Sequence, residues 1–465
     1  MAYFKQKYIT LLSKIWKYSN KLYLPTNKTI ITTVNTDSWF DIEQTNYTDN
    51  TKQFDAKLKK KHVKSTIKCD KIKMYPTPKQ RKILISWMNS YIKMYNETIS
   101  FFKRYYTKHN KVMCNWYTVR TTHLRHIKKK IIETSGINQC KSNIYAHILD
   151  LAIKQACASY KSCLTNLKNG NIKKFRLRHL KYSKRNKILI IEKGMINKKK
   201  NNICSSIFKN AFKLKNNFLM KNIKKDFIIH YDSKTSEFYL YYPQKVIIDQ
   251  YKSNKKNTIS LDPGIRKFLV GFTNDKTIKF CTNLKNKIGK SLNKIRKAKN
   301  KKTYRKVEKH YYKKIKNCVD DMHWKTIKYL TNNYSNILIG NMCTKSIVNN
   351  KYSNLTAKTK EIAMLMRLGV FKCRLQHKCN INKVGYKEVD EAYTSKTCTK
   401  CGYINITLGG NEIFTCTKCK YTIDRDINGA RNILLRNINI HKKRRSNINK
   451  KYIKYKQMYQ NIKKY

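Results

Sequence analysis

The chain has 465 residues, of which 103 are Lys or Arg and 26 are Asp or Glu, so its formal net charge is +77. An excess of positive charge on this scale repels itself and favours a polyanionic partner, either a nucleic acid or an anionic surface. Hydrophobic residues make up 40% of the chain and aromatic residues 12%, which is enough for packed cores and excludes disorder of the whole chain. The length corresponds to two to four domains.

The sequence contains no run of roughly eighteen apolar residues that could span a bilayer. Its first residues are basic but carry no apolar block followed by a small-residue cleavage site, so we expect no secretory signal. The 15 Cys are mostly single, which fits a reducing compartment. We therefore expect an intracellular protein without a membrane partner. It would act in the nucleus or viral factory of a eukaryotic or viral system, and otherwise in the cytoplasm.

The first part of the chain, residues 1–60, reads as a polar extension with one strand-like patch over 29–34 and no assigned role. An alternating run over 67–75 then predicts a strand, which the prolines that follow would end. Thr77 can cap a helix with Pro78 at its first position, and apolar residues recur at helical spacing after it.

Residues 61–250 are expected to form an N-terminal lobe of strands and helices that binds nucleic acid. Within it, apolar residues four apart over 143–168 predict a helix with one buried face. Strands are expected over 227–231 and 237–242. In the basic segment 173–178, cations alternate with apolar residues. That pattern suits phosphate binding with base stacking, and equally a half-buried basic strand.

Residues 251–397 carry the pattern of a mixed sheet with helices on its faces. Turn residues separate three short strands, after which helices and single strands alternate. The expected strands are 258–262, 268–273, 277–281, 337–339 and 382–389, and the expected helical stretches are 285–333 and 358–378. Three meandering strands followed by alternating helix and strand is the order of an RNase H-like fold, so we predict a mixed α/β class.

Two Cys-x-x-Cys pairs, Cys398 with Cys401 and Cys416 with Cys419, predict a zinc ribbon over 398–422 inserted into this domain. Four thiolates at such spacing can surround one Zn²⁺ tetrahedrally. The segment between the pairs reads as the ribbon's hairpin, with Gly409-Gly410 for the turn. Because all four ligands are Cys, no coordination position stays open, and the zinc is expected to be structural.

Carboxylates are scarce in this chain, so the presence of acids at the ends of strands and helices needs a structural or functional explanation. Asp262 ends an apolar strand, Asp390 and Glu391 end the last expected strand, and Asp424 and Asp426 start a helix. Two Mg²⁺ ions about 4 Å apart need oxygen ligands that converge from separate segments, and such ends supply them. The structural alternatives are that Asp262 is a turn acid and that Asp426 is a helix cap.

The run Asp424-Arg-Asp426-Ile-Asn428-Gly-Ala-Arg-Asn432, with the Tyr-Thr-Ser and Cys-x-x-Cys residues before it, resembles the C-terminal signature of the TnpB (OrfB) transposon nucleases. It is still more similar to that of their eukaryotic and giant-virus relatives, the Fanzor proteins; both are kin of the type V CRISPR effectors. The strand ending at Asp262 resembles the first RuvC motif of this family. With the segment 74–78 and Gln80 near the start, the resemblance covers roughly 65–435.

The resemblance implies an RNA-guided DNA endonuclease with a single RuvC-like site, a bound guide RNA, and a DNA target chosen by base pairing beside a short motif. Matched position by position, Asp262 is the metal ligand of the first motif and Asp426 that of the third. Gly340 stands where the bacterial proteins carry a catalytic Glu. Glu391 lies where Fanzor-type sequences resemble one another in carrying a relocated Glu, so it is the expected middle ligand.

Asp390 is the alternative to Glu391, because neighbours on an extended strand point to opposite faces, and Glu388 would share the face of Asp390. With the middle ligand in place, two Mg²⁺ ions would support in-line phosphodiester hydrolysis. Without it, the chain would be a catalytically inactive DNA- and RNA-binding protein. A strand transferase is disfavoured, since no Tyr or Ser nucleophile pattern is evident. Residues 423–436 would close the nuclease domain, and 437–465 would be a basic tail.

Overall fold

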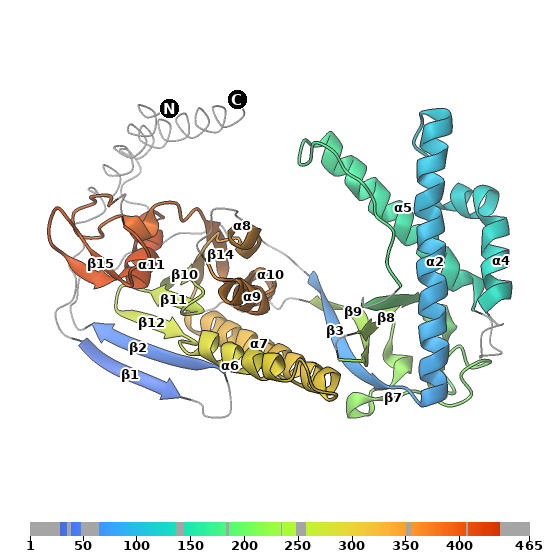
Figure 1. The fold of residues 1–465 in the computed structure, drawn as a ribbon, viewed down its shortest axis with the longest axis horizontal. Coiled ribbons are helices and arrows are strands. Elements are labelled where there is room, and N and C mark those ends of the chain that lie inside the picture. The colour runs from blue at the N-terminus through green and yellow to red at the C-terminus, as the bar shows by residue number, and fades with distance from the viewer. Residues whose placement is uncertain are drawn as a thin grey trace. The chain divides into compact units, whose positions relative to one another are not determined.

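The computed structural model describes residues 28–34, 39–47, 65–135, 144–182, 186–233, 235–247, 257–349, 355–405 and 408–437. The chain divides into two compact units, Ser65–Ile247 and the segments on either side of it, Met1–Lys64 with Ile248–Tyr465. We refer to these as the central unit and the outer unit (Figure 1). The first residues of the expected extension and the basic tail from 438 onward lie outside the described residues.

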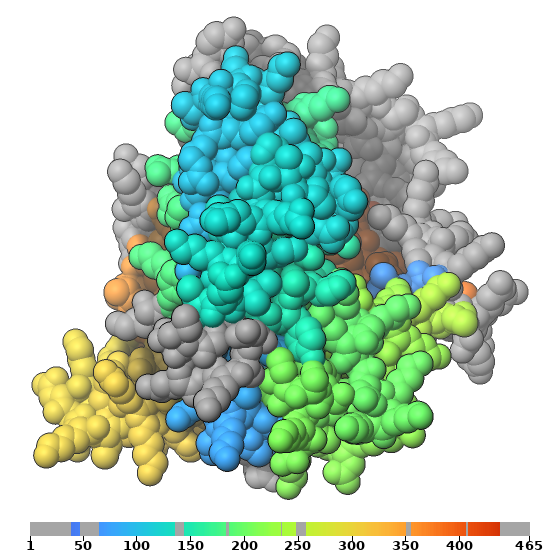
Figure 2. All heavy atoms as spheres, turned by 90° about the vertical axis from the view of Figure 1, so that its right-hand side faces the viewer, coloured from blue at the N-terminus to red at the C-terminus, as the bar shows by residue number. Residues whose placement is uncertain are grey.

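The central unit is built on a five-stranded antiparallel sheet in the order β4-β8-β9-β3-β7, beside a two-stranded pair β5-β6. Its strands are β3 (Ser65–Tyr75), β4 (Lys187–Ile191), β5 (Ile196–Asn197), β6 (Asn202–Ile203), β7 (Lys213–Leu214), β8 (Phe227–Asp232) and β9 (Glu237–Ile247). Its α-helices are α2 (Pro78–His109), α3 (Trp116–Thr118), α4 (Arg125–Ser135) and α5 (Ala146–Lys168). Figure 2 shows this unit from the side on which α2 and α4 lie.

Helix α2 begins as the sequence predicts. The Thr77 side chain accepts a hydrogen bond from the Gln80 N–H, the Gln80 side chain accepts from the Thr77 N–H, and Pro78 is the first helical residue. Its buried face, centred on Trp87 and Tyr91, joins the same core as α5. That core covers the sheet and holds the unit together.

The basic segment 173–178 forms no regular strand. Its cations are exposed while Phe175 and Leu177 are half-buried, and the Phe175 ring meets the Tyr160 ring edge-on at 5.6 Å. The expected alternation of exposed and buried side chains is therefore present, but without the strand. The Lys and Arg side chains of this segment are open to solvent and free of the sheet's ladder.

The outer unit is built on a seven-stranded sheet in the order β1-β2-β12-β11-β10-β13-β14. Neighbours from β1 to β10 are antiparallel, and β10-β13-β14 are parallel. The strands are β1 (Lys28–Val34), β2 (Asp41–Tyr47), β10 (Thr258–Pro263), β11 (Leu269–Phe272), β12 (Lys276–Phe280), β13 (Asn336–Gly340) and β14 (Gly385–Val389). The α-helices are α6 (Leu284–Lys297), α7 (Tyr304–Asn333), α8 (Thr344–Asn349), α9 (Ala357–Leu365), α10 (Leu368–Ile381) and α11 (Arg425–Leu435).

Each face of this sheet has its own core. On one face, Ile259 and Leu261 of β10 pack in the cluster that includes α6, α7 and α10. On the other, Val270, Leu338 and residues of α11 form a smaller cluster. Helices on both faces of a mixed sheet confirm the predicted α/β class. The side chains of β10 alternate between these two faces. Ile259 and Leu261 lie in the larger core, whereas Ser260 and Asp262 point to the other face, toward α11.

Residues 41–47, to which the sequence assigned no role, form a strand of the outer sheet. Strand β2 pairs with β12, so that Ile42 lies opposite Phe280 and is buried in the larger core. The Asp41 carboxylate accepts hydrogen bonds from the Thr282 N–H at 2.8 Å and its hydroxyl at 3.2 Å. Part of the expected extension is therefore a sheet strand of the outer unit.

Two expected helical stretches are each divided. The stretch 285–333 forms α6 and α7, separated by turns over 298–303. The stretch 358–378 forms α9 and α10, separated at Arg367, whose backbone is left-handed (φ 55°). Both breaks let successive helices fold back over the sheet. Among the described residues, no helix is both long and apolar enough to cross a membrane.

Candidate active site and zinc cluster

Four cysteines meet in the ribbon that follows β14. The Sγ atoms of Cys398, Cys401, Cys416 and Cys419 all lie within 4.8 Å of one another, which no other group of potential ligands in the described part of the chain matches. Cys398 and Cys419 are 3.6 Å apart and Cys401 and Cys416 3.5 Å apart, sulfur to sulfur. Thiolates around a tetrahedral Zn²⁺ with bonds of about 2.3 Å would be about 3.8 Å apart, so these side chains fit that ion.

The two cysteine turns share one backbone pattern. Cys398 N–H donates to the Tyr403 carbonyl and Gly402 N–H to the Cys398 carbonyl, and Cys416 repeats both bonds with Tyr421 and Lys420. Gly402 and Lys420, at equivalent places, are both left-handed, with φ of 74° and 57°. The repeated geometry is what brings two pairs of sulfur atoms to one point.

The expected hairpin with a Gly409-Gly410 turn is not how the ribbon is built. The strand pair is β15 (Ile413–Thr415) with β16 (Thr422–Asp424), so the second cysteine turn is itself the hairpin's turn. The Gly409 and Gly410 carbonyls instead accept hydrogen bonds from the side chains of Arg425 and Arg266. The glycines thereby tie the ribbon to the loop after β10 and to the start of α11.

Asp262 lies near the end of β10, on the face that α11 covers. Parallel pairing of Leu261 with Ile339 places this end of β10 beside Gly340 at the end of β13. A Cβ built on Gly429 of α11 would lie 2.4 Å from the Asp262 Oδ2, so only a glycine lets the helix approach this carboxylate. The Ser260 hydroxyl donates to the Ala430 carbonyl at 2.7 Å and fixes the same approach.

Glu391 follows β14 and reaches back over the end of β13. A Cβ on Gly340 would lie 2.2 Å from Glu391 Oε2 and 3.0 Å from Pro263 Cδ, the residue after Asp262. The Glu391 carboxylate therefore occupies the space above Gly340. Its Oε2 is buried and makes no hydrogen bond among the described residues. A buried oxygen without a donor is expensive unless something else binds it.

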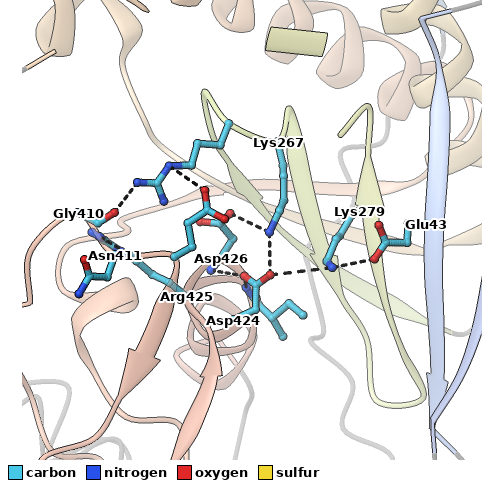
Figure 3. A network of polar contacts seen from close by, with 11 residues as sticks. Glu43, Lys267, Lys279, Gly410, Asn411, Asp424, Arg425 and Asp426 are labelled. Atoms are coloured by element: carbon cyan, nitrogen blue, oxygen red, sulfur yellow. Dashed lines mark hydrogen bonds and ion pairs between the residues drawn. The ribbon is translucent and has the colours of Figure 1, made fainter. Parts of the chain in front are cut away.

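Asp426 lies in the first turn of α11, and Asp424 is the residue that caps this helix. The Asp424 Oδ1 accepts from the N–H groups of Asp426 at 2.9 Å and Ile427 at 3.3 Å. The interpretation of Asp426 as a helix cap is therefore wrong. Its carboxylate is left to face Lys267, whose Nζ lies 2.7 Å from Asp424 Oδ2 and 3.5 Å from Asp426 Oδ2 (Figure 3).

A line of alternating charges extends from these acids across β12 to strand β2 (Figure 3). Beyond Asp424, Lys279 of β12 lies 4.0 Å from that carboxylate and 2.8 Å from Glu43 of β2. Two lysines thus neutralise Asp424, while Asp426 is held by one of them at the longer distance. Of the two acids, Asp426 therefore has the fewer and longer ion pairs with these lysines.

The three predicted catalytic acids interact electrostatically. Burial raises the pKa of Asp262 well above its ordinary range, and the charges of Glu391 and Asp426 raise it further. Burial also raises the pKa of Glu391, against Lys372 and the Met342 N–H, which lower it. It raises the pKa of Asp426, against the opposing charge of Lys267. A buried carboxyl whose pKa is raised further by two neighbouring acids, as for Asp262, is typical of a functional centre.

The other two candidates for the middle acid are engaged elsewhere. The Asp390 carboxylate lies 3.3 Å from the Arg436 guanidinium. Glu388 accepts a hydrogen bond from the Tyr386 hydroxyl at 2.9 Å and lies 3.4 Å from Lys372 Nζ. Of the three acids, the structure brings Glu391 alone to Gly340 and Asp262. The catalytic role of Asp262, Glu391 and Asp426 stays a prediction.

Several residues around this centre were not singled out by the sequence. Lys267 and Lys279 carry no signal in a chain with so many lysines. Gly429 could have been noticed as a glycine inside a helical motif, where it costs stability without a reason. Asn428 and Asn432 belong to the motif that carries the resemblance, but their role becomes visible only in the folded chain.

A buried cysteine cluster next to an acidic centre on a mixed sheet defines the class of protein: a zinc-ribbon α/β protein with a candidate metal-dependent site. The chain matches the family described as Cas12f1-like, TNB domain, over residues 369–433. It is 31% identical to the TnpB-like protein L770 of Acanthamoeba polyphaga mimivirus, covering 93% of this chain and 88% of that protein. It is also 31% identical to the TnpB-like protein R854 of the same virus, over 90% of this chain and 85% of that protein. The chain belongs to the TnpB-like protein family of giant viruses.

Among solved structures, the chain is similar to the protein in the cryo-EM structure of a Cas12f1–sgRNA–target DNA complex. The two are 17% identical with a TM-score of 0.31, covering 79% of this chain and 98% of that one. A likeness at this level extends neither the guide nor the target of that protein to this chain.

Proposed function

We propose that this protein is an RNA-guided DNA endonuclease that hydrolyses phosphodiester bonds at one RuvC-like site formed by Asp262, Glu391 and Asp426. The observation that carries the proposal is that Asp262, near the end of β10, interacts electrostatically with Glu391, after β14, and with Asp426, at the start of α11, although the three acids are not grouped as closely as the four cysteines. Membership of the TnpB-like family and a net charge of +77 support nucleic acid as the partner.

The outer unit supports an RNase H-like assignment. Three antiparallel strands, β12-β11-β10, continue into two parallel strands, β13 and β14, with helices on both faces. In this arrangement the ends of β10, β13 and β14 lie at one edge of the sheet, where acids can converge. The proposed domains are a nuclease domain over 251–397 and 423–436, interrupted by the ribbon at 398–422, and a nucleic-acid-binding lobe over 61–250.

The three carboxylates would hold the catalytic Mg²⁺ ions. The fit rests on Glu391 Oε2, a buried oxygen without a hydrogen-bond donor among the described residues, and on Asp262, whose pKa is raised by burial and by the charges of Glu391 and Asp426. When bound, the ions would activate the attacking water and stabilise the leaving oxygen. The protein's own part is to fix the carboxylates, with Lys267 restraining Asp426 and the end of β13 shaping the place of Glu391.

The test is to purify the protein from cells with its RNA, sequence that RNA, and incubate the complex with matched duplex DNA and Mg²⁺. Cutting should be lost in Asp262→Ala and in Glu391→Ala. Asp321→Ala is the matched control, because the exposed Asp321 carboxylate pairs with Lys325 one turn away on helix α7.

The absence of an acid at Gly340 favours one competing function, a nucleic-acid-binding protein that has lost catalysis. The same experiment separates the two. A wild-type complex that binds matched DNA without cutting it overturns the endonuclease. Normal cutting by Glu391→Ala, with a dead Asp262→Ala, shows that the middle ligand lies elsewhere.

A further inference from the structure

One stripe of helix α11 carries three polar side chains that do not face solvent. Asn428, Asn432 and Arg436, the last directly after the helix, are four residues apart and so share a face. Both asparagines are fully buried. Buried amides in a helix interior are costly unless each finds a partner, so this stripe calls for an explanation.

All three side chains donate to backbone carbonyls of one segment. The Asn428 Nδ2 donates to the Thr397 carbonyl at 2.8 Å, and the Asn432 Nδ2 to the Thr394 and Thr397 carbonyls, both at 2.7 Å. Arg436 donates to the Asp390 carbonyl at 2.8 Å and the Ala392 carbonyl at 3.3 Å. The Asn428 Oδ1 also accepts from the Thr399 N–H at 3.2 Å.

The segment whose carbonyls accept these hydrogen bonds, residues 390–397, carries Glu391. It is a tight turn in which the Thr394 hydroxyl donates to the Glu391 carbonyl at 2.8 Å. The Thr397 hydroxyl donates likewise to the Tyr393 carbonyl at 2.7 Å, and Tyr393 itself is left-handed at φ 64°. A turn held by so many bonds to carbonyls has a fixed backbone, which in turn fixes where the Glu391 side chain starts.

We propose that Asn428, Asn432 and Arg436 are positioning residues that lock the Glu391 segment onto the helix that carries Asp426. The inference rests on the proposed function, because it assigns the stripe a role in assembling that site. The same helix meets β10 through Gly429 and Ala430, beside Asp262. Helix α11 therefore sets the spacing of all three acids. It carries Asp426, it packs against Asp262, and its stripe of polar side chains holds the segment of Glu391.

The grip also connects the zinc ribbon to the acids. Thr397 and Thr399 lie on either side of Cys398, and Asn428 bonds to both. The first cysteine turn and the Glu391 turn are thus held by the same amide. Zinc loading and carboxylate spacing are coupled through a few backbone groups rather than through side chains of the site.

The experiment uses the full-length protein with its copurified RNA and compares Asn432→Asp and Arg436→Ala with wild type. Asn432→Asp keeps the shape but removes the donor. Asn333→Ala is the control, since the exposed Asn333 amide donates to the Tyr329 carbonyl of its own helix α7. Three quantities are measured: Mn²⁺ affinity, zinc content, and amide hydrogen exchange of the peptide spanning 390–397.

We expect each stripe variant to retain zinc and RNA, to exchange faster over 390–397, and to bind Mn²⁺ roughly 10- to 100-fold more weakly, as for other residues that orient metal ligands. A merely structural role would lower the folded fraction and leave the Mn²⁺ affinity of that fraction unchanged. Wild-type Mn²⁺ affinity in both variants, or unchanged exchange in both, overturns the proposal.

The Asp262→Ala variant separates the two levels of inference. If wild type shows no Mn²⁺ binding that depends on Asp262, the proposed function fails. The proposal that the stripe holds the segment 390–397 is then tested by amide hydrogen exchange alone. Faster exchange of this segment in Asn432→Asp supports the proposal, and unchanged exchange overturns it. If Asp262-dependent binding is present and the stripe variants leave it intact, the endonuclease stands and the positioning role falls.

Discussion

At the scale of single residues, two glycines make room for two of the three predicted catalytic carboxylates. A Cβ at Gly340 would lie 2.2 Å from the Glu391 carboxylate, and one at Gly429 would lie 2.4 Å from that of Asp262. Contacts this short do not occur between real atoms, so each acid depends on the absence of a side chain at a neighbour. The glycine at position 340 therefore leaves the room that the Glu391 carboxylate occupies at the end of β13.

Gly340→Ala should abolish or strongly reduce DNA cutting while the protein stays folded. The added methyl group would displace the Glu391 carboxylate, and a shift of about 1 Å in a catalytic group costs on the order of 100-fold in rate. Gly369→Ala is the matched control, because a Cβ there meets no atom within 4 Å. The measurement is the cleavage rate beside the melting temperature.

Two results would contradict this reading of Gly340. Cutting at the wild-type rate by Gly340→Ala would mean that Glu391 is placed differently from its position here. A large fall in melting temperature together with the loss of cutting would make the glycine a requirement of the fold.

Asp262→Asn should stabilise the protein in metal-free buffer at neutral pH. The folded-state pKa of Asp262 lies well above its unfolded value through burial and the charges of Glu391 and Asp426. The ionised carboxylate is therefore less favourable in the folded protein than in the unfolded chain, and the stability that is present below the unfolded pKa is lost as pH rises through the folded pKa. Neutralising the group removes that penalty. Since one pKa unit is worth about 1.4 kcal/mol, and each kcal/mol moves Tm by roughly 2–4 °C, the rise is measurable.

On the proposed function, in which Mg²⁺ binds the folded state through Asp262, the same variant should lose the stabilisation that Mg²⁺ gives wild type. Melting curves with and without Mg²⁺ measure both effects, with the exposed Asp321→Asn as control. Lower metal-free stability in Asp262→Asn would show that this carboxylate has a structural partner.

Residue types with strong chemical constraints were predictable from the sequence. The four cysteines carry their spacing with them, and Asp262 and Asp426 stand at element ends within motifs. Lys267 was not predictable, because its ion pair with Asp424 joins residues 157 positions apart through a loop turn. No local pattern encodes which of many lysines faces an acid.

At the scale of elements, the ribbon and helix α11 form one construction. Cys398→Ser should reduce bound zinc and loosen the 390–399 segment, since the Cys398 turn is bonded to Asn428. The metal contributes directly to the folding of such modules. Metal analysis of the purified protein measures the zinc content. Cys373→Ser, at an exposed position outside the cluster, should retain a full complement. Full zinc in Cys398→Ser would rule out the cluster as the ligand set.

Strand β2 should contribute to the stability of the outer unit. Ile42 is 7% exposed and packs opposite Phe280, so Ile42→Ala should cost about 2–4 kcal/mol through lost burial and a cavity. Thr45→Ala on the opposite face of the same strand is the control, with an expected change below about 0.5 kcal/mol. Denaturant unfolding measures both. Equal, small changes would mean that β2 is dispensable to the core.

The elements themselves were predicted better than their breaks. Apolar spacing marked the helical stretches, but α9 and α10 part at Arg367, a residue type that does not usually take a left-handed backbone. The break is imposed by the tertiary fold, which needs α10 to return over the sheet toward β14. Apolar periodicity predicts which face of a helix is buried, but it does not predict the residue at which the helix must end.

At the scale of the whole molecule, part of the scarce negative charge is used within the outer unit to pair with its lysines. Glu43, Asp424 and Asp426 lie in one network with Lys267 and Lys279 (Figure 3). Each such pairing neutralises a lysine that would otherwise face solvent. The uncompensated charge is therefore left on exposed side chains and on segments with few acids, where it can meet phosphates.

The last segment of the chain allows this distribution to be tested. Residues 438–465 contain ten Lys or Arg and no acid. If they grip RNA phosphates, each contact releases a counterion, and the slope of log affinity against log salt changes by about 0.7 per contact on single strands. Removing 438–465 should then lower the steepness of that slope by several units, up to about 7, while affinity falls most at low salt. Binding of the copurified RNA across a salt series measures both quantities. A tail of scrambled order should behave as wild type, because the effect depends on charge rather than on sequence. An unchanged slope after truncation would place the phosphate contacts on the central and outer units instead.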